Sequence, residues 1–331
     1  MRIRPSAIAV PTARVPIVRL SGTFCALLAG VLLAALLLPP GAVRAAAAAT
    51  APDPAPNTTS GTVPPDASPE AASTTAAGAL PAAPAITAKA AYLVDATTGT
   101  ELFAKNADRP LPVASLAKVM TAIVVREEGS LDDVITITKG DVRHAVRNGA
   151  SRAGLRAGER FTTRELLYAL MLPSAADAAH ALARRYGPGV PNFVAKMNRA
   201  AEDLGLERTY YTNPDGLPRP DLGGRSTARE QTRLAMIALS DPVLNEIAST
   251  ARHSLPKTAG HRAYTWRNSN KLLTRAEGVF GLKTGFTRAA GFCLSFAAVR
   301  DGRFLFGTVL GEATEANRLR SATRLLDLAQ T

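Results

Sequence analysis

The sequence predicts an α/β (α+β) fold, in which one antiparallel sheet built from both ends of the folded region is flanked by helices and joined to a helical middle. Short strands are expected near residue 95, longer strands after residue 278, and runs of helical apolar spacing between them. Because strands at the two ends can share one sheet, the roughly 245 residues of the folded region suffice for a single two-lobed domain.

The folded region, residues 86–331, is expected to open with a hairpin. Residues 91–95 and 101–103 are apolar segments separated by two threonines and Gly99, a pattern typical of two short strands and a turn. Three runs of apolar residues with helical spacing follow, and they predict helices over residues 115–127, 163–185 and 194–204.

The C-terminal part predicts three strands, over residues 279–282, 292–299 and 304–310. Asp301 and Gly302 stand between the last two strands, and an Asp-Gly pair in this position is a strong hairpin signal. Residues 319–328 have amphipathic helical spacing and are expected to close the chain as a helix.

Residues 1–45 are interpreted as a targeting segment. A basic stretch leads into residues 24–38, which carry no charge, and Val43-Arg44-Ala45 offers small residues for signal cleavage. Extended back to Leu20, the apolar stretch approaches the roughly 20 residues that a membrane-spanning helix needs, so an uncleaved anchor is the alternative. In both cases we expect the protein to be exported to the periplasm, the cell wall or the medium, with membrane association through this segment if it is retained.

Charge narrows the classes of partner. The formal net charge is +12, and five of the 39 Lys and Arg residues lie within residues 1–45, which leaves 34 basic against 27 acidic residues, or +7, for the remainder. A moderately basic domain suits an anionic membrane surface or an acidic polymer. No Lys/Arg-rich run is interleaved with aromatic residues, so we expect no nucleic-acid partner.

The cysteines and histidines give no metal signature. Cleavage after residue 45 would remove Cys25 and leave Cys293, which excludes an intrachain disulfide and a cysteine-ligated metal in the processed chain. Cys293 follows Phe292 and precedes Leu294, so we expect a buried small hydrophobe. The histidines show no HExxH spacing. We therefore expect neither a metal nor a cofactor.

Three short patterns carry chemistry. In Ser115-Leu-Ala-Lys118, a helix would place the lysine amine one turn after the serine hydroxyl on the same face, within reach as a general base. Ser254-Leu-Pro-Lys257 repeats the spacing, but Pro256 argues against a helix there.

The second pattern is Lys283-Thr284-Gly285, which follows a predicted strand. Its lysine and threonine can bind a carboxylate, and its glycine permits close backbone approach. The third pattern is Ser174-Ala-Ala176 in the helical middle.

Together and in this order, the three patterns resemble the SxxK, SxN and KTG motifs of penicillin-binding proteins and serine β-lactamases. Longer stretches are closer to the D-alanyl-D-alanine carboxypeptidase branch; they include residues 91–99, 112–121, 154–159, 170–182, 213–216, 270–273 and 281–294. The resemblance covers nearly everything from residue 90 to residue 311. It implies the DD-peptidase/β-lactamase-like fold, an antiparallel sheet flanked by helices with a helical subdomain.

The resemblance also implies an activity and partners. The expected reaction removes the terminal D-alanine from peptidoglycan stem peptides through an acyl-enzyme, without metal or cofactor, and β-lactams are expected to be covalent inhibitors. Ser115 would be the nucleophile, Lys118 its base and Ser174 a proton relay to the leaving group. For Lys118 to accept a proton it must be neutral, and burial beside cationic Lys283 would lower its pKa.

The remaining implied roles concern substrate binding. Lys283 and Thr284 would hold the terminal carboxylate, and Gly285 would let the substrate backbone approach. The backbone N–H groups of Ser115 and Phe286 would form an oxyanion hole.

One position departs from the family pattern: Ala176 stands where the SxN asparagine is expected. Losing such a hydrogen-bonding partner costs ~1–3 kcal/mol, or roughly tenfold to a hundredfold in rate. A weakly active or non-catalytic penicillin-binding or peptidoglycan-binding protein is therefore the alternative function. A DD-endopeptidase would use the same machinery, whereas a β-lactamase is disfavoured because no glutamate-bearing deacylation loop is evident.

Residues 46–85 are rich in Ala, Pro and Thr and contain no aromatic residue, so they cannot bury enough apolar surface to fold. We predict that limited proteolysis of the purified protein removes residues up to about 85 rapidly and then stops at a resistant core. Mass spectrometry of the fragments checks this, and protection of residues 50–80 would show that the segment is not a disordered tether.

Overall fold

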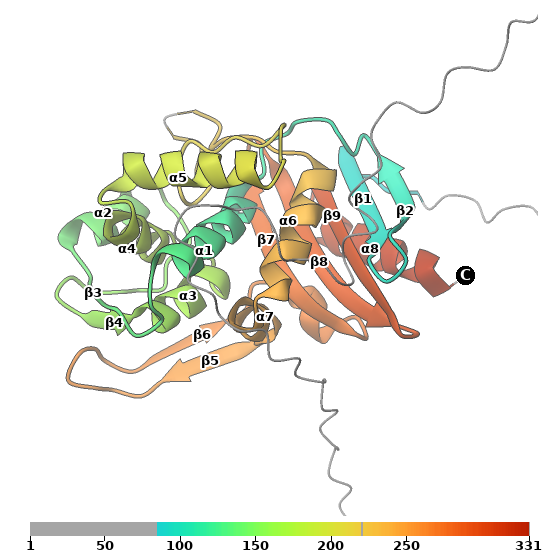
Figure 1. Cartoon of the computed structure of the whole chain (residues 1–331). Coiled ribbons are helices and arrows are strands. Elements are labelled where there is room, and N and C mark those ends of the chain that lie inside the picture. The colour runs from blue at the N-terminus through green and yellow to red at the C-terminus, as the bar shows by residue number, and fades with distance from the viewer. Residues whose placement is uncertain (1–84, 220, 331) are drawn as a thin grey trace, which may run out of the picture. The chain divides into compact units, whose positions relative to one another are not determined.

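The computed structural model describes residues 85–219 and 221–330. Its centre is a five-stranded antiparallel sheet in the order β2-β1-β9-β8-β7 (Figure 1). The strands are β1 (Ala90–Asp95), β2 (Thr100–Lys105), β7 (Val279–Thr287), β8 (Gly291–Arg300) and β9 (Arg303–Glu312). Because β1 pairs with β9, the two ends of the folded region lie side by side, which confirms the predicted sheet.

The turn between β8 and β9 lies at the predicted residues. Asp301 has a φ of 49° and Gly302 a φ of 75°. Two successive positive φ values are typical of a type I′ turn, whose twist matches that of the flanking strands. Arg300 and Arg303 close the ladder on either side of it.

Apolar side chains alternate between the two faces of the sheet. On β9, Leu305 and Val309 pack in the core beneath α8 (Glu315–Asp327), whereas Phe306 and Leu310 belong to the larger core on the opposite face. Helix α6 (Ala228–Ser240) packs on that opposite face, against β9, β1 and β8. Both faces are therefore covered, which explains why these strands are apolar on both sides.

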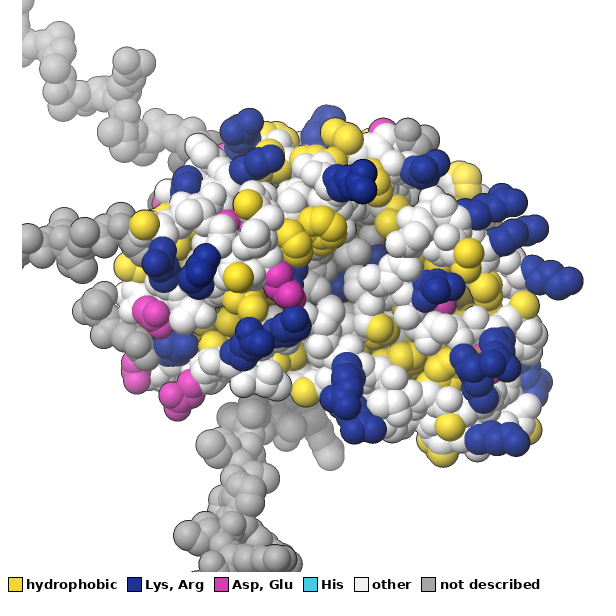
Figure 2. All heavy atoms as spheres, turned by 180° about the vertical axis from the view of Figure 1, so that it is seen from behind, with side chains coloured by type: hydrophobic (Ala, Val, Ile, Leu, Met, Phe, Trp, Pro, Cys, Tyr) yellow, Lys and Arg dark blue, Asp and Glu magenta, His cyan; other side chains and the backbone are white. Residues whose placement is uncertain are grey.

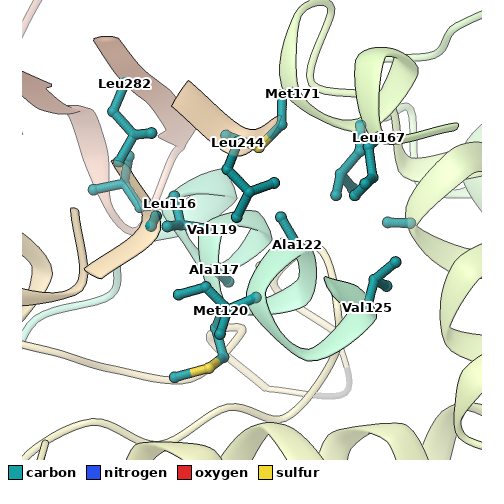
Figure 3. Close-up of a cluster of buried hydrophobic side chains, with 14 of the residues drawn as sticks. Leu116, Ala117, Val119, Met120, Ala122, Val125, Leu167, Met171, Leu244 and Leu282 are labelled. Carbon is teal, nitrogen blue, oxygen red and sulfur yellow. The ribbon is translucent and has the colours of Figure 1, made fainter. Parts of the chain in front are cut away.

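Helix α1 (Ala117–Glu128) is the central element of the helical half. All nine residues from Ala117 to Val125 are buried, as expected for a helix surrounded by other elements rather than lying on the surface. Figure 3 shows the side chains that α1 meets: Leu167 and Met171 of α3 (Thr163–Met171), Leu244 of α7 (Pro242–Ser249) and Leu282 of β7. Helix α1 thus joins the helical half to the edge strand of the sheet.

The other elements complete the helical half and its rim. They are β3 (Val134–Thr136), α2 (Lys139–Arg147), β4 (Arg160–Thr162), α4 (Ala176–Tyr186), α5 (Val190–Asp203), β5 (Arg252–Leu255), β6 (Tyr264–Arg267) and the 3-10 turns η2 (Ala114–Leu116), η3 (Lys271–Thr274) and η4 (Leu328–Gln330). Sequence analysis did not predict α2, α6, α7 or the β3–β4 and β5–β6 hairpins. Strands of three or four residues carry too little periodicity to be recognised, but the capping box of Thr138 and Asp141 was an available signal for α2.

The predicted helical run over residues 163–185 is wrong at its centre, because α3 ends at Met171 and α4 begins at Ala176. Pro173 lacks a backbone N–H, so it cannot donate the hydrogen bond that would continue α3. Ser174, the next residue, has a φ of 62°. The interruption matters because it turns Ser174 out of a helix and into a loop.

No helix that the structure describes, over residues 85–219 and 221–330, is long and apolar enough to cross a membrane. The predicted targeting segment, residues 1–45, lies outside the described residues, and so does the predicted tether apart from residue 85.

The packing of the sheet makes a prediction about stability. Gly307 lies opposite Phe296, and a Cβ at residue 307 would overlap the buried Phe296 ring. We expect Gly307→Ala to lower the free energy of unfolding by about 1–3 kcal/mol, because the ring must leave its position. The control is Gly140→Ala in α2, where the added methyl meets Thr138 at an ordinary 3.4 Å and should be neutral or stabilising by up to about 1 kcal/mol. Urea titration measures both, and equal effects would contradict the account.

Candidate active site

A cavity of about 240 Å³ opens at the junction of the sheet and the helical half. Figure 2 shows a hollow near the centre of the face turned away from the viewer in Figure 1. The lining includes these residues from the sequence-predicted site: Ser115, Lys118, Ser174, Thr284, Gly285 and Phe286. Lys283, the remaining predicted residue, is buried beside them and 1% exposed.

Ser115 lies in the 3-10 turn η2, immediately before α1. Ala114, the residue before it, has a φ of 50°, a left-handed conformation that a side chain with a Cβ rarely adopts. This turn brings Ser115 to the same side as Lys118, whose Nζ donates a hydrogen bond to Ser115 Oγ at 2.9 Å. The structure therefore places the two predicted residues in direct contact.

Lys118 is buried, with 1% of its surface exposed. Its Nζ also donates to the backbone carbonyl of Asp215, at 2.8 Å. Burial lowers the pKa of Lys118 to about 8, although the negative charges of Asp215 and Asp177 act in the opposite direction. An amine with this pKa is partly neutral under mildly alkaline conditions and can accept the proton of the Ser115 hydroxyl.

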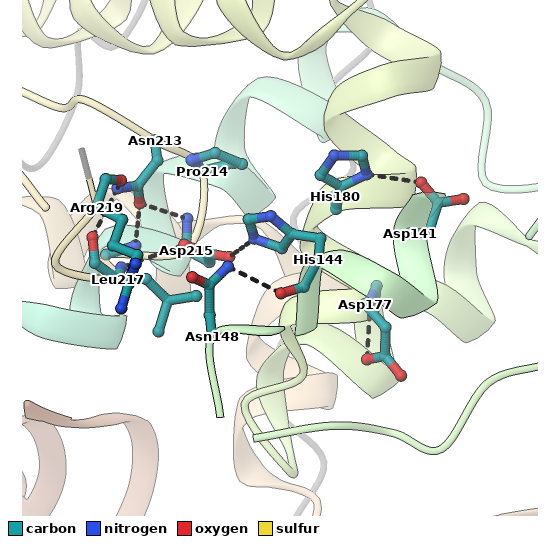
Figure 4. Close-up of polar contacts among 12 residues, drawn as sticks. Asp141, His144, Asn148, Asp177, His180, Asn213, Pro214, Asp215, Leu217 and Arg219 are labelled. Atoms are coloured by element: carbon teal, nitrogen blue, oxygen red, sulfur yellow. Dashed lines mark hydrogen bonds and ion pairs between the residues drawn. The ribbon is translucent and has the colours of Figure 1, made fainter. Parts of the chain in front are cut away.

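Residues 213–217 form the loop that supplies the Asp215 carbonyl (Figure 4). The Asn213 side chain accepts hydrogen bonds from the backbone N–H groups of Asp215 and Gly216 and donates to the Leu217 carbonyl. Gly216 has a φ of 72°, and a Cβ there would overlap the Ala114 carbonyl. The loop therefore packs directly against the turn that carries Ser115, and it needs glycine to do so.

The opposite wall of the cavity is the edge strand β7. Gly285 lies so close to the serine turn that a Cβ there would be 2.8 Å from the Val113 carbonyl oxygen and 3.1 Å from the Ser115 nitrogen. Thr284 Oγ1 is hydrogen-bonded to Ser269 Oγ at 2.7 Å. Ser269 also lines the cavity, and sequence analysis did not single it out.

Lys283 and Arg318 add two cations to this wall. Lys283 Nζ donates to the Thr284 carbonyl at 3.0 Å. Burial, followed by the positive charges of Lys118 and Arg318, lowers the pKa of Lys283 well below its usual value. Three neighbouring basic side chains in a buried place favour the binding of an anion such as a carboxylate, which stabilises their charged forms.

Arg318, on α8, is the main residue that sequence analysis missed. It lines the cavity, is 4% exposed, and donates to the Cys293 carbonyl at 3.4 Å and to Glu315 at 3.2 Å. Its guanidinium carbon lies 5.6 Å from the centre of the Phe292 ring. No signal in the sequence pointed to it, because one arginine in an amphipathic helix is ordinary and its neighbours in the cavity are distant in sequence.

Ser174 and Ala176 occupy different positions relative to the cavity. Ser174 lines it from the loop between α3 and α4, whereas Ala176 is not among the lining residues. Ala176 is the first residue of α4, is 1% exposed, and donates its N–H to the Ser151 carbonyl at 2.9 Å. An asparagine there would have to fit into a closed space.

The second Ser-x-x-Lys pattern lies elsewhere. Ser254 is exposed on strand β5 and shares a 3.0 Å hydrogen bond with Thr265, so it is not in a helix, as Pro256 indicated. Cys293 is fully buried, which confirms the prediction of a small hydrophobe, and burial raises the pKa of its thiol to about 11. Within residues 85–219 and 221–330, no group of three or more His, Cys, Asp and Glu side chains could hold a metal ion.

The arrangement is suited to acyl transfer to a serine. A hydroxyl touches a partly neutral amine, as nucleophilic catalysis requires, and cations on the far wall can hold a carboxylate. A molecule that carries a carboxylate next to a carbonyl group would fit this pattern.

Known proteins with similar sequences belong to one enzyme family. A model of the family described as D-alanyl-D-alanine carboxypeptidase matches residues 77–314. The D-alanyl-D-alanine carboxypeptidase of Streptomyces sp. (strain K15) is 38% identical over 266 residues, which cover 76% of this chain and 91% of that protein. The D-alanyl-D-alanine endopeptidase of Pseudomonas aeruginosa is 33% identical over 248 residues, which cover 74% of this chain and 78% of that protein.

Solved structures agree. The crystal structure of the Streptomyces K15 DD-transpeptidase matches with a TM-score of 0.71 and 37% identity, over 75% of this chain and 98% of the other. The D-alanyl-D-alanine carboxypeptidase of Mycobacterium tuberculosis H37Rv matches with a TM-score of 0.70 and 32% identity, over 77% and 94% of the two chains.

Proposed function

The chain belongs to the D-alanyl-D-alanine carboxypeptidase family, and on that premise we propose that it removes the terminal D-alanine of peptidoglycan stem peptides through an acyl-enzyme on Ser115. The observation that carries the proposal is the 2.9 Å contact between Lys118 Nζ and Ser115 Oγ inside a cavity whose opposite wall carries Arg318 and Lys283. Release of D-alanine from a peptide ending in D-Ala-D-Ala, measured with the purified protein, tests the reaction.

The terminal carboxylate of the peptide would bind at the cationic wall. Arg318 and the hydroxyl of Thr284 line the cavity there, and Lys283 lies behind them. An arriving carboxylate would favour the charged form of Lys283, which burial and the neighbouring cations disfavour in its absence. The scissile carbonyl would then lie near the backbone N–H groups of Ser115 and Phe286, where Gly285 allows close approach.

Acylation would proceed in two steps. Neutral Lys118 takes the hydroxyl proton while Ser115 Oγ bonds to the carbonyl carbon, and the oxyanion that forms is stabilised by the backbone N–H groups. The proton then passes to the nitrogen of the leaving residue, with Ser174 as the relay; the carbon–nitrogen bond breaks and D-alanine leaves. Water subsequently attacks the ester, with Lys118 again as base, and restores the free serine.

The acceptor of the acyl group defines the activity more finely. Relatives of this chain are named carboxypeptidase, endopeptidase and transpeptidase. All three activities can proceed through the same kind of acyl-enzyme. They differ in the leaving group or in the molecule that receives the acyl group. We propose hydrolysis of a terminal D-alanine as the reaction of this chain.

Export and surface contacts form the last part of the proposal. We propose that residues 1–45 direct the chain across the membrane, because an uncharged apolar stretch follows a basic one. Retention of this segment would add membrane association. Basic side chains are scattered over the face in Figure 2, in keeping with the net charge of +12 and with anionic surroundings.

We predict that a fluorescent penicillin labels Ser115, because the β-lactam amide mimics the scissile bond. Ser115→Ala should abolish labelling, since it removes the attacking oxygen. Ser254→Ala is the matched control and should label like the parent, because Ser254 is exposed on β5. Gel fluorescence and peptide mapping measure the outcome; a label that persists in Ser115→Ala would refute the assignment.

The departure at Ala176 yields a separate prediction. Helix α4 packs against α1, and the charge of Asp177 in its first turn raises the pKa of Lys118. We expect Ala176→Asn to raise the acylation rate by up to about tenfold to a hundredfold, because one hydrogen-bonding partner is regained. Stopped-flow measurement with a fluorescent penicillin gives the rate.

Ala176→Leu is the control for this experiment, because leucine has the same branched arrangement of side-chain heavy atoms as asparagine but no amide. If neither variant is faster than the parent, with the fold intact by circular dichroism, the site is built around alanine. The alternative of a binding protein without efficient turnover would then be favoured.

A further inference from the structure

Lys118 is linked to a histidine through one intervening residue. The carbonyl oxygen of Asp215 accepts from Lys118 Nζ at 2.8 Å, and the carboxylate of the same residue lies 2.6 Å from Nε2 of His144 on α2. The Asp215 side chain is fully buried and that of His144 is 24% exposed. A continuous path of contacts therefore runs from the surface through His144 and Asp215 to Lys118. Figure 4 shows the contact between His144 and Asp215.

The Asp215 carboxylate depends on His144 for a side-chain partner. Its other oxygen accepts the backbone N–H of Leu217 at 3.2 Å. Among the residues that the structure describes, His144 is the one side chain hydrogen-bonded to this carboxylate. A buried carboxylate that loses such a partner leaves an uncompensated charge, and the chain around it must move or take in water.

The charges around this path oppose one another. Burial raises the pKa of Asp215, but the hydrogen bond from His144 and the charge of Lys118 outweigh it, so the pKa of this carboxyl is lowered and it is ionised. On Lys118, burial lowers the pKa, while the charges of Asp215 from the loop and Asp177 from α4 raise it. Lys283 of β7 is the cation that faces Lys118 from the sheet.

We propose that His144 is a positioning residue for the catalytic lysine: by binding the Asp215 carboxylate, it fixes the carbonyl that directs the Lys118 amine toward Ser115. His144 is not among the residues that line the cavity, so it acts through Asp215 and not on the substrate. The proposal rests on the proposed role of Lys118 as the general base.

His180 provides a matched control. Its Nδ1 lies 2.7 Å from Asp141, its ring centre is 4.7 Å from that of His144, and its side chain is 22% exposed. Asp141 is bound by Arg184 and by the Thr138 N–H, at the start of α2, and does not contact Lys118. Removing His180 thus removes a similar His–Asp pair from the same region without removing any hydrogen bond of the path to the lysine, and phenylalanine keeps an aromatic ring beside His144.

The experiment compares His144→Phe, His144→Gln and His180→Phe in the full-length protein. We expect His144→Phe to lower kcat for D-alanine release by about tenfold to a hundredfold, the effect of one lost hydrogen bond to a charged group, with KM unchanged. His144→Gln keeps a donor and should retain most of the activity. His180→Phe should keep the parent kcat.

The pH dependence of acylation by penicillin is the second measurement, taken on both sides of pH 8. The rate should rise with pH as Lys118 loses its proton, because the neutral amine is the base. Asp215→Asn removes a negative charge that raises the pKa of Lys118, so the rising limb should move to lower pH. This isosteric variant also tests the path if His144→Phe fails to fold.

Three results would overturn the inference. The first is a His144→Phe protein with the parent kcat. The second is an equal loss of kcat in His144→Phe and His180→Phe, which would assign both histidines to the packing of α2 against α4. The third is an unmoved pH limb in Asp215→Asn. Failure of the proposed function is distinguishable, because it would appear as labelling that survives Ser115→Ala.

Discussion

The burial of a single amine constrains the rest of the site. Lys118 is 1% exposed, and a charged ammonium withdrawn from water costs several kcal/mol unless partners replace the solvent. Two features reduce this cost. Burial lowers the pKa of Lys118 to about 8, and two oxygens, Ser115 Oγ and the Asp215 carbonyl, accept hydrogen bonds from the amine. To bring those oxygens into place, Ala114 adopts a positive φ and the loop at Gly216 packs against it without room for a Cβ. The unusual backbone is thus a consequence of where the lysine must lie.

The opposite wall of the cavity carries two buried basic side chains. Lys283 and Arg318 are both buried, and burial, followed by the positive charges of Lys118 and Arg318, lowers the pKa of Lys283. A terminal carboxylate would supply the negative charge that these basic groups favour. In the proposed reaction this would link recognition to catalysis, because the anion that stabilises the charge on Lys283 would also bring the scissile carbonyl toward Ser115. A peptide without a free carboxylate would leave these cations uncompensated.

Local signals explain why much of the fold and of the site was predictable. The Asp301-Gly302 pair specifies its turn chemically, and the three motifs lie on short continuous segments where residue spacing decides geometry. Contacts between distant segments were not predictable: Arg318 and Ser269 reach the cavity only after the sheet has formed, and neither stands in a motif. The break at Pro173 was missed for another reason, since the apolar spacing of α3 and α4 continues across it. Periodicity reports burial, and two helices packed end to end can bury the same face.

The surroundings of Ala176 indicate which role of the family's asparagine is lost in this chain. The family's asparagine would serve both the lysine and the backbone of the substrate. In this chain Lys118 already has two acceptors, one of them the Asp215 carbonyl, which the loop around Asn213 and the pair with His144 hold in place. A carbonyl on the far side of the lysine can orient the amine, but it cannot donate a hydrogen bond to a bound peptide. We therefore infer that the alanine weakens the hold on the peptide backbone more than it disturbs the base.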